Sequence, residues 1–144
     1  MFNGLGWSLG YCLRRISKSR PSGALLPASS RLWQAERPAT WGAAGPNSYD
    51  CSGLALQAWA RAGVRLLHWT GYQWVSGPHV PLDRLRRGDL VFFAYNTADP
   101  ATIHHVGVYI GNGLMVDAPY TGAFVEIDSI YAVGGLIGAT RPAA

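Results

Sequence analysis

The sequence contains no run of about twenty apolar residues, the length that a helix needs to cross a bilayer. It therefore predicts no integral membrane segment. Cysteine is also scarce, because only Cys12 and Cys51 are present, and their different surroundings do not indicate a disulfide framework. Residues 1–20 place their positive charges after the apolar stretch, the reverse of the order in a secretory signal. The sequence itself shows no export route.

Basic residues are concentrated near the N-terminus. Of the 12 Lys and Arg residues, six lie in residues 1–37 against one acid, Glu36, whereas residues 38–144 carry six Arg against seven acids, a balance of −1. No Lys or Arg cluster in this near-neutral part is interleaved with aromatic residues. Nucleic-acid binding is therefore not expected.

Composition divides the chain into two parts. Residues 1–30 are rich in Gly, Ser, Pro and Arg without a sustained period, and we interpret them as a basic, disordered leader or linker. Residues 31–144 are long enough for one compact domain with its own core.

A helix is predicted directly after Cys51. In LALQAWARAG, at residues 54–63, apolar side chains recur on one helical face, and Gly63 provides a C-terminal stop. Ser48 or Asp50 can cap the start. Cys51 is therefore expected at the N-terminus of a helix, where the dipole favours a thiolate.

Short strands are predicted after a loop at residues 65–88. Their expected bounds are residues 89–93, 105–110, 114–118, 123–127 and 136–140. One helix followed by consecutive strands predicts an α+β domain in which the helix packs on an antiparallel β-sheet.

The turn at residues 111–113, Gly-Asn-Gly, decides which side chains of its two strands share a face. We predict a three-residue loop, because it makes one face wholly apolar by pairing Ile110 with Leu114, Val108 with Val116 and Val106 with Ala118. The opposite face then carries His105, Gly107, Tyr109, Met115 and Asp117. His105 and Asp117 are diagonal neighbours there, about 7–8 Å apart at the backbone, a gap that the two side chains can bridge.

A cysteine, a histidine and a carboxylate in this arrangement indicate acyl transfer. Cys51 is the predicted nucleophile, His105 the base that takes its proton, and Asp117 the group that orients the imidazole. The backbone N–H of Cys51 is one candidate donor to the oxyanion.

These residue types also have structural interpretations. A cysteine at a helix start is more often a small packed hydrophobe than a nucleophile, and Asp117 also fits a turn or an edge position. His104 competes with His105, but strand alternation turns it toward the apolar face, away from Asp117. His68 and His79 lie in the expected loop without ligand spacing, so we interpret them as surface groups.

The sequence also resembles the NlpC/P60 family of papain-like cell-wall cysteine endopeptidases. The resemblance runs from about Trp41 to Arg141 and is carried by YDCSG at 49–53, RRGDLVFF at 86–93, HHVGVYIGNGLMVDAPYTG at 104–122 and IGATR at 137–141. It implies a papain-like fold in which Cys51 is the nucleophile, His105 the base and Asp117 the third, polar residue. It further implies that substrate is bound by Tyr49, Asp50 and Ser52.

Members of this family typically hydrolyse the bond between the side-chain carboxyl of D-glutamate and diaminopimelate in peptidoglycan stem peptides. The resemblance therefore implies a secreted or cell-wall-associated peptidoglycan hydrolase whose partners are stem peptides. It implies no metal or organic cofactor, and no oligomeric state follows from it.

One departure from the family pattern keeps a second hypothesis open. Where similar proteins usually show Gly-x-Pro-Tyr before Trp41, residues 36–39 read Glu-Arg-Pro-Ala and lack the aromatic side chain. This segment favours a catalytically weak or inactive wall-binding module of the same fold, whereas the intact Cys51, His105 and Asp117 favour the enzyme. An amidase or acyltransferase that uses the same residues is a third hypothesis, because fold does not fix function.

Overall fold

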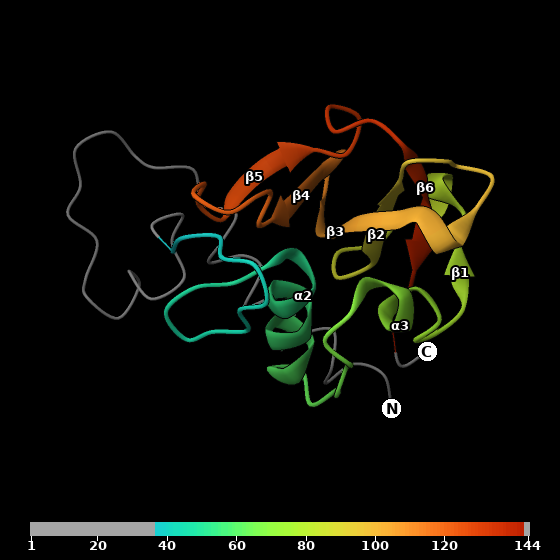
Figure 1. The fold of residues 1–144 in the computed structure, drawn as a ribbon. Helices are drawn as coiled ribbons and strands as arrows, with labels where there is room; N and C mark the ends of the chain where they lie inside the picture. The colour runs from blue at the N-terminus through green and yellow to red at the C-terminus, as the bar shows by residue number, and fades with distance from the viewer. Residues whose placement is uncertain (1–36, 143–144) are drawn as a thin grey trace.

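The computed structural model describes residues 37–142, which form a six-stranded antiparallel sheet with two short helices on one face (Figure 1). The strands are β1 (His79–Val80), β2 (Leu90–Ala94), β3 (Ile103–Gly111), β4 (Leu114–Asp117), β5 (Glu126–Ser129) and β6 (Leu136–Thr140). The helices are α2 (Cys51–Ala60) and α3 (Thr70–Trp74), with 3-10 turns at Leu82–Arg84 and Pro100–Thr102. In space the strand order is β1-β6-β2-β3-β4-β5. The predicted α+β class with an antiparallel sheet is confirmed.

Helix α2 begins at Cys51 because Asp50 caps it. Asp50 has an extended backbone, and its side chain accepts a hydrogen bond from the N–H of Gly53, as an N-cap residue does. After the helix ends at Ala60, Gly63 has a φ of +83°. The predicted helix is therefore confirmed, with its bounds shifted toward Cys51, and α2 packs against β3 and β4.

Both faces of the sheet carry buried apolar side chains. On the helix side, Leu90, Phe92, Val106, Val108 and Val116 pack beneath α2, and each is at most 1% exposed. The smaller cluster on the opposite face consists of Val80, Val91, Phe93, Met115, Ile130 and Ala139. Strand residues alternate between the two faces, so every residue of β2 is buried.

The β3–β4 hairpin has the predicted faces but a different turn. Val108 pairs with Val116, as predicted, whereas Leu114 pairs with Gly111 instead of Ile110. The predicted three-residue loop was therefore wrong.

The physical reason is a shorter turn combined with a β-bulge. Asn112 and Gly113 have φ values of +56° and +72°, which suit the two central residues of a type I′ hairpin turn. A register shift between Tyr109 and Gly111 absorbs one extra residue. Because the bulge restores the alternation beyond it, the faces that the sequence predicts are retained.

Residues 65–88 are more structured than the predicted loop. They contain α3, β1 and a 3-10 turn, and each element is five residues or shorter. Trp74 of α3 packs edge-on against Phe92, with ring centroids 5.2 Å apart, so α3 lies on the same face as α2. Elements this short leave no periodic pattern in the sequence, which explains why the prediction missed them.

The first described segment lies beside the residues that precede β5. The N–H of Ala39 donates to the carbonyl of Ala123 at 2.8 Å, and Pro38 forms an antiparallel bridge with Phe124. Residues 123–125 therefore pair with this segment, and β5 begins at Glu126 instead of the predicted residue 123.

Some predictions fall outside the residues that the structure describes. The predicted leader, residues 1–30, and Cys12 lie there. Within residues 37–142, no helix has the length and apolar character needed to cross a membrane.

Candidate active site

Strands β3 and β4 bring His105 and Asp117 into contact. Nε2 of His105 lies 2.7 Å from Oδ2 of Asp117, and the two residues are 6% and 1% exposed. An ionised carboxylate only accepts hydrogen bonds, so Nε2–H donates. This leaves Nδ1 of the imidazole for a second partner.

Cys51 interacts with the same imidazole. Burial alone would lower the pKa of His105, but hydrogen bonds and charge interactions with Asp117 and Cys51 outweigh it and raise the pKa from 6.5 to about 9. At neutral pH the imidazole is therefore in its protonated, positively charged form. A protonated imidazole and the N-terminus of α2 thus both lie beside the thiol of Cys51.

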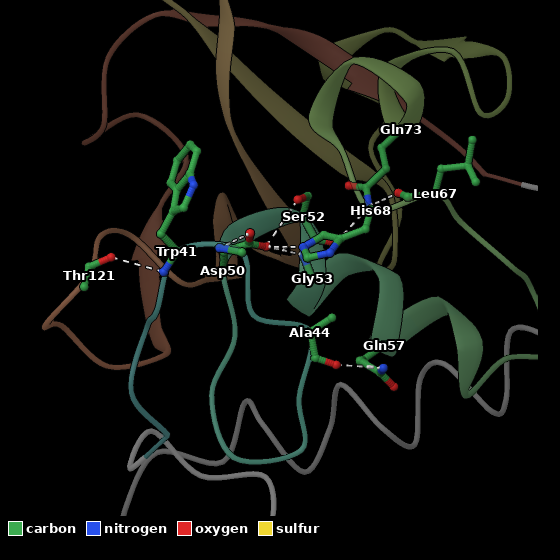
Figure 2. A network of polar contacts seen from close by, with 11 residues as sticks. Trp41, Ala44, Asp50, Ser52, Gly53, Gln57, Leu67, His68, Gln73 and Thr121 are labelled. Carbon is green, nitrogen blue, oxygen red and sulfur yellow. Dashed lines mark hydrogen bonds and ion pairs between the residues drawn. The ribbon is translucent and has the colours of Figure 1, made fainter.

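Cys51, His104 and His105 open onto one cleft. Two chain segments, residues 39–41 and 118–121, line it together with Asp50. The backbone N–H of Trp41 donates to Oγ1 of Thr121 at 3.1 Å, which joins these two segments (Figure 2). The side chains of Trp41 and Tyr120 are largely exposed, at 87% and 70%, and are therefore available to a ligand.

The carboxylate of Asp50 is the centre of a polar network beside Cys51 (Figure 2). Oδ1 accepts hydrogen bonds from the N–H of Gly53 at 2.6 Å and from the hydroxyl of Ser52 at 3.2 Å. Oδ2 accepts from the N–H of Gly42 at 2.9 Å, and Nε2 of His68 lies 2.8 Å from Oδ1. Asp50 therefore connects α2 to two separate loops.

Of the three residues predicted to bind substrate, Asp50 alone lines the cleft. Tyr49 and Ser52 are each 6% exposed, and Tyr49 packs in the helix-side core. Substrate binding by these residues stays a prediction, and the structure gives Tyr49 a packing role.

Gly53 allows the loop before Cys51 to approach α2. A Cβ at Gly53 would collide with the backbone oxygen of Ala43. That oxygen accepts a hydrogen bond from the N–H of Asp50 at 2.7 Å, and the neighbouring carbonyl of Ala44 accepts one from Gln57 at 2.9 Å. The loop is thus fixed against the first turns of the helix, a requirement that the sequence analysis did not recognise.

Two histidines have surroundings that differ from those predicted from the sequence. His104 is exposed and stacks on Tyr95, with ring centroids 4.0 Å apart, instead of facing the apolar side. Phe93 pairs with His105 and the next pair is Ala94 with Ile103, so His104 is the extra residue of a bulge where alternation fails. Burial and the nearby His105 lower the pKa of His104.

His68 is the second of these histidines. It was interpreted as a surface group but is paired with Asp50. The two residues are 18 positions apart, one in a helix cap and the other in a loop. Such a contact follows no periodic pattern in the sequence, so it is recognised only in the folded structure.

An ion pair joins two of the motifs outside the cleft. Asp89 of RRGDLVFF accepts hydrogen bonds from Nε and Nη2 of Arg141 of IGATR, both at 2.8 Å. The hydrogen bonding of its guanidinium to Asp89 is the largest cause of the raised pKa of Arg141. Because β2 and β6 are neighbours in the sheet, this pair stabilises the scaffold of the site. Within residues 37–142, no group of three or more His, Cys, Asp or Glu side chains is arranged to hold a metal ion.

Sequence comparison agrees with this geometry. The profile of the NlpC/P60 family matches residues 36–134. The chain belongs to the NlpC/P60 family. Peptidoglycan endopeptidase RipA of Mycolicibacterium smegmatis is 37% identical over 110 residues, which are 67% of this chain and 21% of RipA. Gamma-D-glutamyl-L-lysine dipeptidyl-peptidase of Bacillus subtilis is 41% identical over 90 residues, which are 62% of this chain and 30% of that protein. The chain thus spans less than a third of either relative.

Solved structures of NlpC/P60 proteins share the fold. One from Bacillus cereus has a TM-score of 0.68 and 32% identity, and the match covers 72% of this chain and 35% of that chain. The NlpC/p60 domain of the peptidoglycan hydrolase SagA has a TM-score of 0.70 at 22% identity, with 94% of this chain and 97% of that chain covered. The second likeness concerns the fold alone, and both confirm the predicted papain-like class.

Proposed function

We propose that this protein is a cysteine endopeptidase that hydrolyses peptidoglycan stem peptides at the cell wall. The observation that carries the proposal is the chain of contacts from Asp117 through His105 to Cys51, beside an open cleft. The names of NlpC/P60 relatives, among them a peptidoglycan endopeptidase and a probable endopeptidase, support the same class. In this proposal residues 31–144 form the peptidase domain and residues 1–30 its leader or linker.

The proposed reaction begins at Cys51. Its thiolate attacks the carbonyl carbon of the scissile amide, and the carbonyl oxygen becomes an oxyanion. The first N–H groups of a helix have no acceptor within the helix, so the N–H of Cys51 can stabilise that negative charge.

His105 then transfers protons in both halves of the reaction. Its imidazolium protonates the leaving amine as the C–N bond breaks, which leaves a thioester on Cys51. The neutral imidazole next takes a proton from water, whose oxygen attacks the thioester. The thiolate–imidazolium pair returns, and the released carboxylic acid loses its proton to solvent. Asp117 keeps the ring oriented throughout by its hydrogen bond to Nε2.

The bond that we propose is the one between the side-chain carboxyl of D-glutamate and diaminopimelate. The family resemblance supports this choice, and the name of the Bacillus subtilis relative specifies the same γ-D-glutamyl group before lysine. The acyl half of the substrate is common to both bonds. The residue that follows D-glutamate is therefore the point that an experiment must decide.

The test compares two stem peptides that differ at this residue. The full chain and its Cys51→Ala variant are incubated with L-Ala-γ-D-Glu-diaminopimelate and L-Ala-γ-D-Glu-L-Lys peptides, and products are identified by mass spectrometry. We expect cleavage after D-glutamate in the diaminopimelate peptide and none with the variant. A folded wild-type protein that cleaves neither peptide would support the inactive wall-binding module, and cleavage at another bond would support an amidase.

A further inference from the structure

The pair formed by His68 and Asp50 lies directly beside the nucleophile, outside the proposed triad. Asp50 precedes Cys51, caps its helix and lines the cleft. His68 does not line the cleft, and it reaches Asp50 from the loop between α2 and α3 (Figure 2). The side chains of His68 and Asp50 are 30% and 17% exposed, so the pair is partly shielded from water.

The loop that carries His68 is held against the first turn of α2. Nε2 of Gln73 donates to the carbonyl of Leu67 at 2.9 Å and to the carbonyl of Ser52 at 2.8 Å. Gln73 is completely buried. A single amide group therefore fixes the position of His68 relative to the residue that follows Cys51.

The hydrogen bond has a defined direction. An ionised carboxylate only accepts, so Nε2 of His68 donates its N–H to Oδ1 of Asp50. This contact needs a donor at Nε2, which both the imidazolium and the neutral tautomer protonated at Nε2 provide.

The negative charge of Asp50 has opposing effects on Cys51. The carboxylate caps α2 through Gly53 and so preserves the helix terminus that favours a thiolate. A carboxylate next to a thiol also disfavours the thiolate, because two negative charges repel. A donor on Oδ1 reduces this repulsion while the cap is retained.

We propose that His68 is a positioning residue that acts through Asp50: it holds the carboxylate in its capping geometry and offsets its charge at Cys51. The inference rests on the proposed role of Cys51 as the nucleophile. His68 then affects the reactivity of the thiol without contacting substrate.

The test uses two amides of different reach at position 68. The amide nitrogen of Gln lies about as far along the side chain as Nε2 of His, whereas that of Asn is one bond shorter. The rate of Cys51 alkylation by iodoacetamide is measured between pH 5 and pH 10 in the full-length wild type, His68→Gln and His68→Asn, with the labelled peptide identified by mass spectrometry. The matched control is His79→Gln, because His79 is an exposed histidine on β1 that contacts Thr140 and Trp74.

We expect His68→Asn to move the alkylation midpoint to higher pH and to lower the rate at pH 7 about tenfold, the effect of losing one hydrogen bond to a charged group. His68→Gln should stay within about twofold of the wild type, as should His79→Gln. Equal profiles for Asn and wild type, or equal losses for Asn and Gln, would overturn the proposal. Both substitutions are at a partly exposed site, and their thermal unfolding identifies any loss of fold.

Alkylation of Cys51 does not depend on turnover of a substrate. The proposed function and the proposed role of His68 can therefore be disproved independently. If the wild type cleaves no stem peptide but His68→Asn still shifts the alkylation profile, the proposed function is wrong and the role of His68 stands. If stem peptides are cleaved and the profiles coincide, only the role of His68 is wrong.

Discussion

Asp117 holds His105 through one oxygen alone. Oδ2 lies 2.7 Å from Nε2 of His105, whereas Oδ1 is buried and has no hydrogen-bond partner among residues 37–142. A buried carboxylate oxygen without a partner is destabilising. The protonated imidazole is therefore the main group that stabilises the charge of Asp117, and a change to either residue should appear in the pH dependence of the site.

Asp117→Asn should lower the upper pH limit of activity. The substitution removes a negative charge that raises the pKa of His105, so that pKa should fall from about 9 toward 6.5. In the proposed mechanism, the imidazolium that protonates the leaving group is then lost at lower pH. We expect the alkaline limb of kcat/KM to move down by about one pH unit or more, with a loss of about tenfold at pH 8 and a smaller loss at pH 6.

A suitable control is Asp128→Asn, which changes a carboxylate on β5 that bonds the N–H of Ser129. It should leave the alkaline limb in place. A limb that does not move in Asp117→Asn would contradict the proposed role of the Asp117–His105 contact in catalysis.

Gly53→Ala should destabilise the protein, although helix propensity alone predicts a gain of about 1 kcal/mol. The new Cβ would collide with the backbone oxygen of Ala43 and displace the loop before Cys51. We expect a loss of about 1–3 kcal/mol in the free energy of unfolding, measured in urea, together with reduced kcat/KM. Ala60→Gly at the exposed end of the same helix should cost about 1 kcal/mol through propensity. A more stable Gly53→Ala protein would show that the loop yields without cost.

Arg141→Gln should destabilise the sheet without changing the chemistry of the cleft. Asp89 is almost fully buried and would lose both hydrogen bonds from the guanidinium. We expect about 2–3 kcal/mol less unfolding free energy, with kcat unchanged at temperatures where the variant is folded. Arg65→Gln, at an exposed arginine, should stay within about 0.5 kcal/mol of the wild type. Equal urea midpoints for the two variants would contradict a stabilising role for the ion pair.

Trp41→Ala should weaken substrate binding more than it slows the chemical steps. The indole is 87% exposed and lines the cleft near Cys51. We expect KM for a stem peptide to rise about fivefold to tenfold, kcat to change less than about twofold, and stability to change by less than about 0.5 kcal/mol. Tyr131→Ala removes another aromatic ring, 72% exposed, that does not line the cleft, and should leave KM unaltered. A lowered kcat with the wild-type KM would exclude this role for Trp41.

The sequence predicted those elements in which apolar side chains recur at a regular spacing. The helix after Cys51 and the paired faces of β3 and β4 leave periodic apolar patterns, and these patterns placed His105 and Asp117 on one face of the sheet. The prediction of the turn was wrong, because a bulge adds a residue without changing which side chains share a face. Helix α3 and strand β1 were missed because neither is long enough to form a pattern.

Contacts between loops could not be predicted from the sequence. His68 bonds Asp50 across 18 positions, and Trp41 reaches the cleft because its backbone N–H bonds Thr121, 80 positions away. Neither contact follows a helical or strand period. Ala39, which stands where similar proteins usually have Tyr, lines the cleft without an aromatic ring, whereas Trp41 and Tyr120 contribute aromatic rings elsewhere on its lining.

The place of β6 in the sheet has a consequence for biosynthesis. β6 lies between β1 and β2, although it follows every other strand within residues 37–142. While the ribosome is still translating residues before 136, one edge of β2 lacks its neighbour, and β2 consists of the apolar residues LVFFA. An unpaired apolar edge promotes aggregation. We therefore expect the nascent domain to be prone to self-association until residues 136–140 are synthesised and pair with β2, unless a chaperone covers that edge.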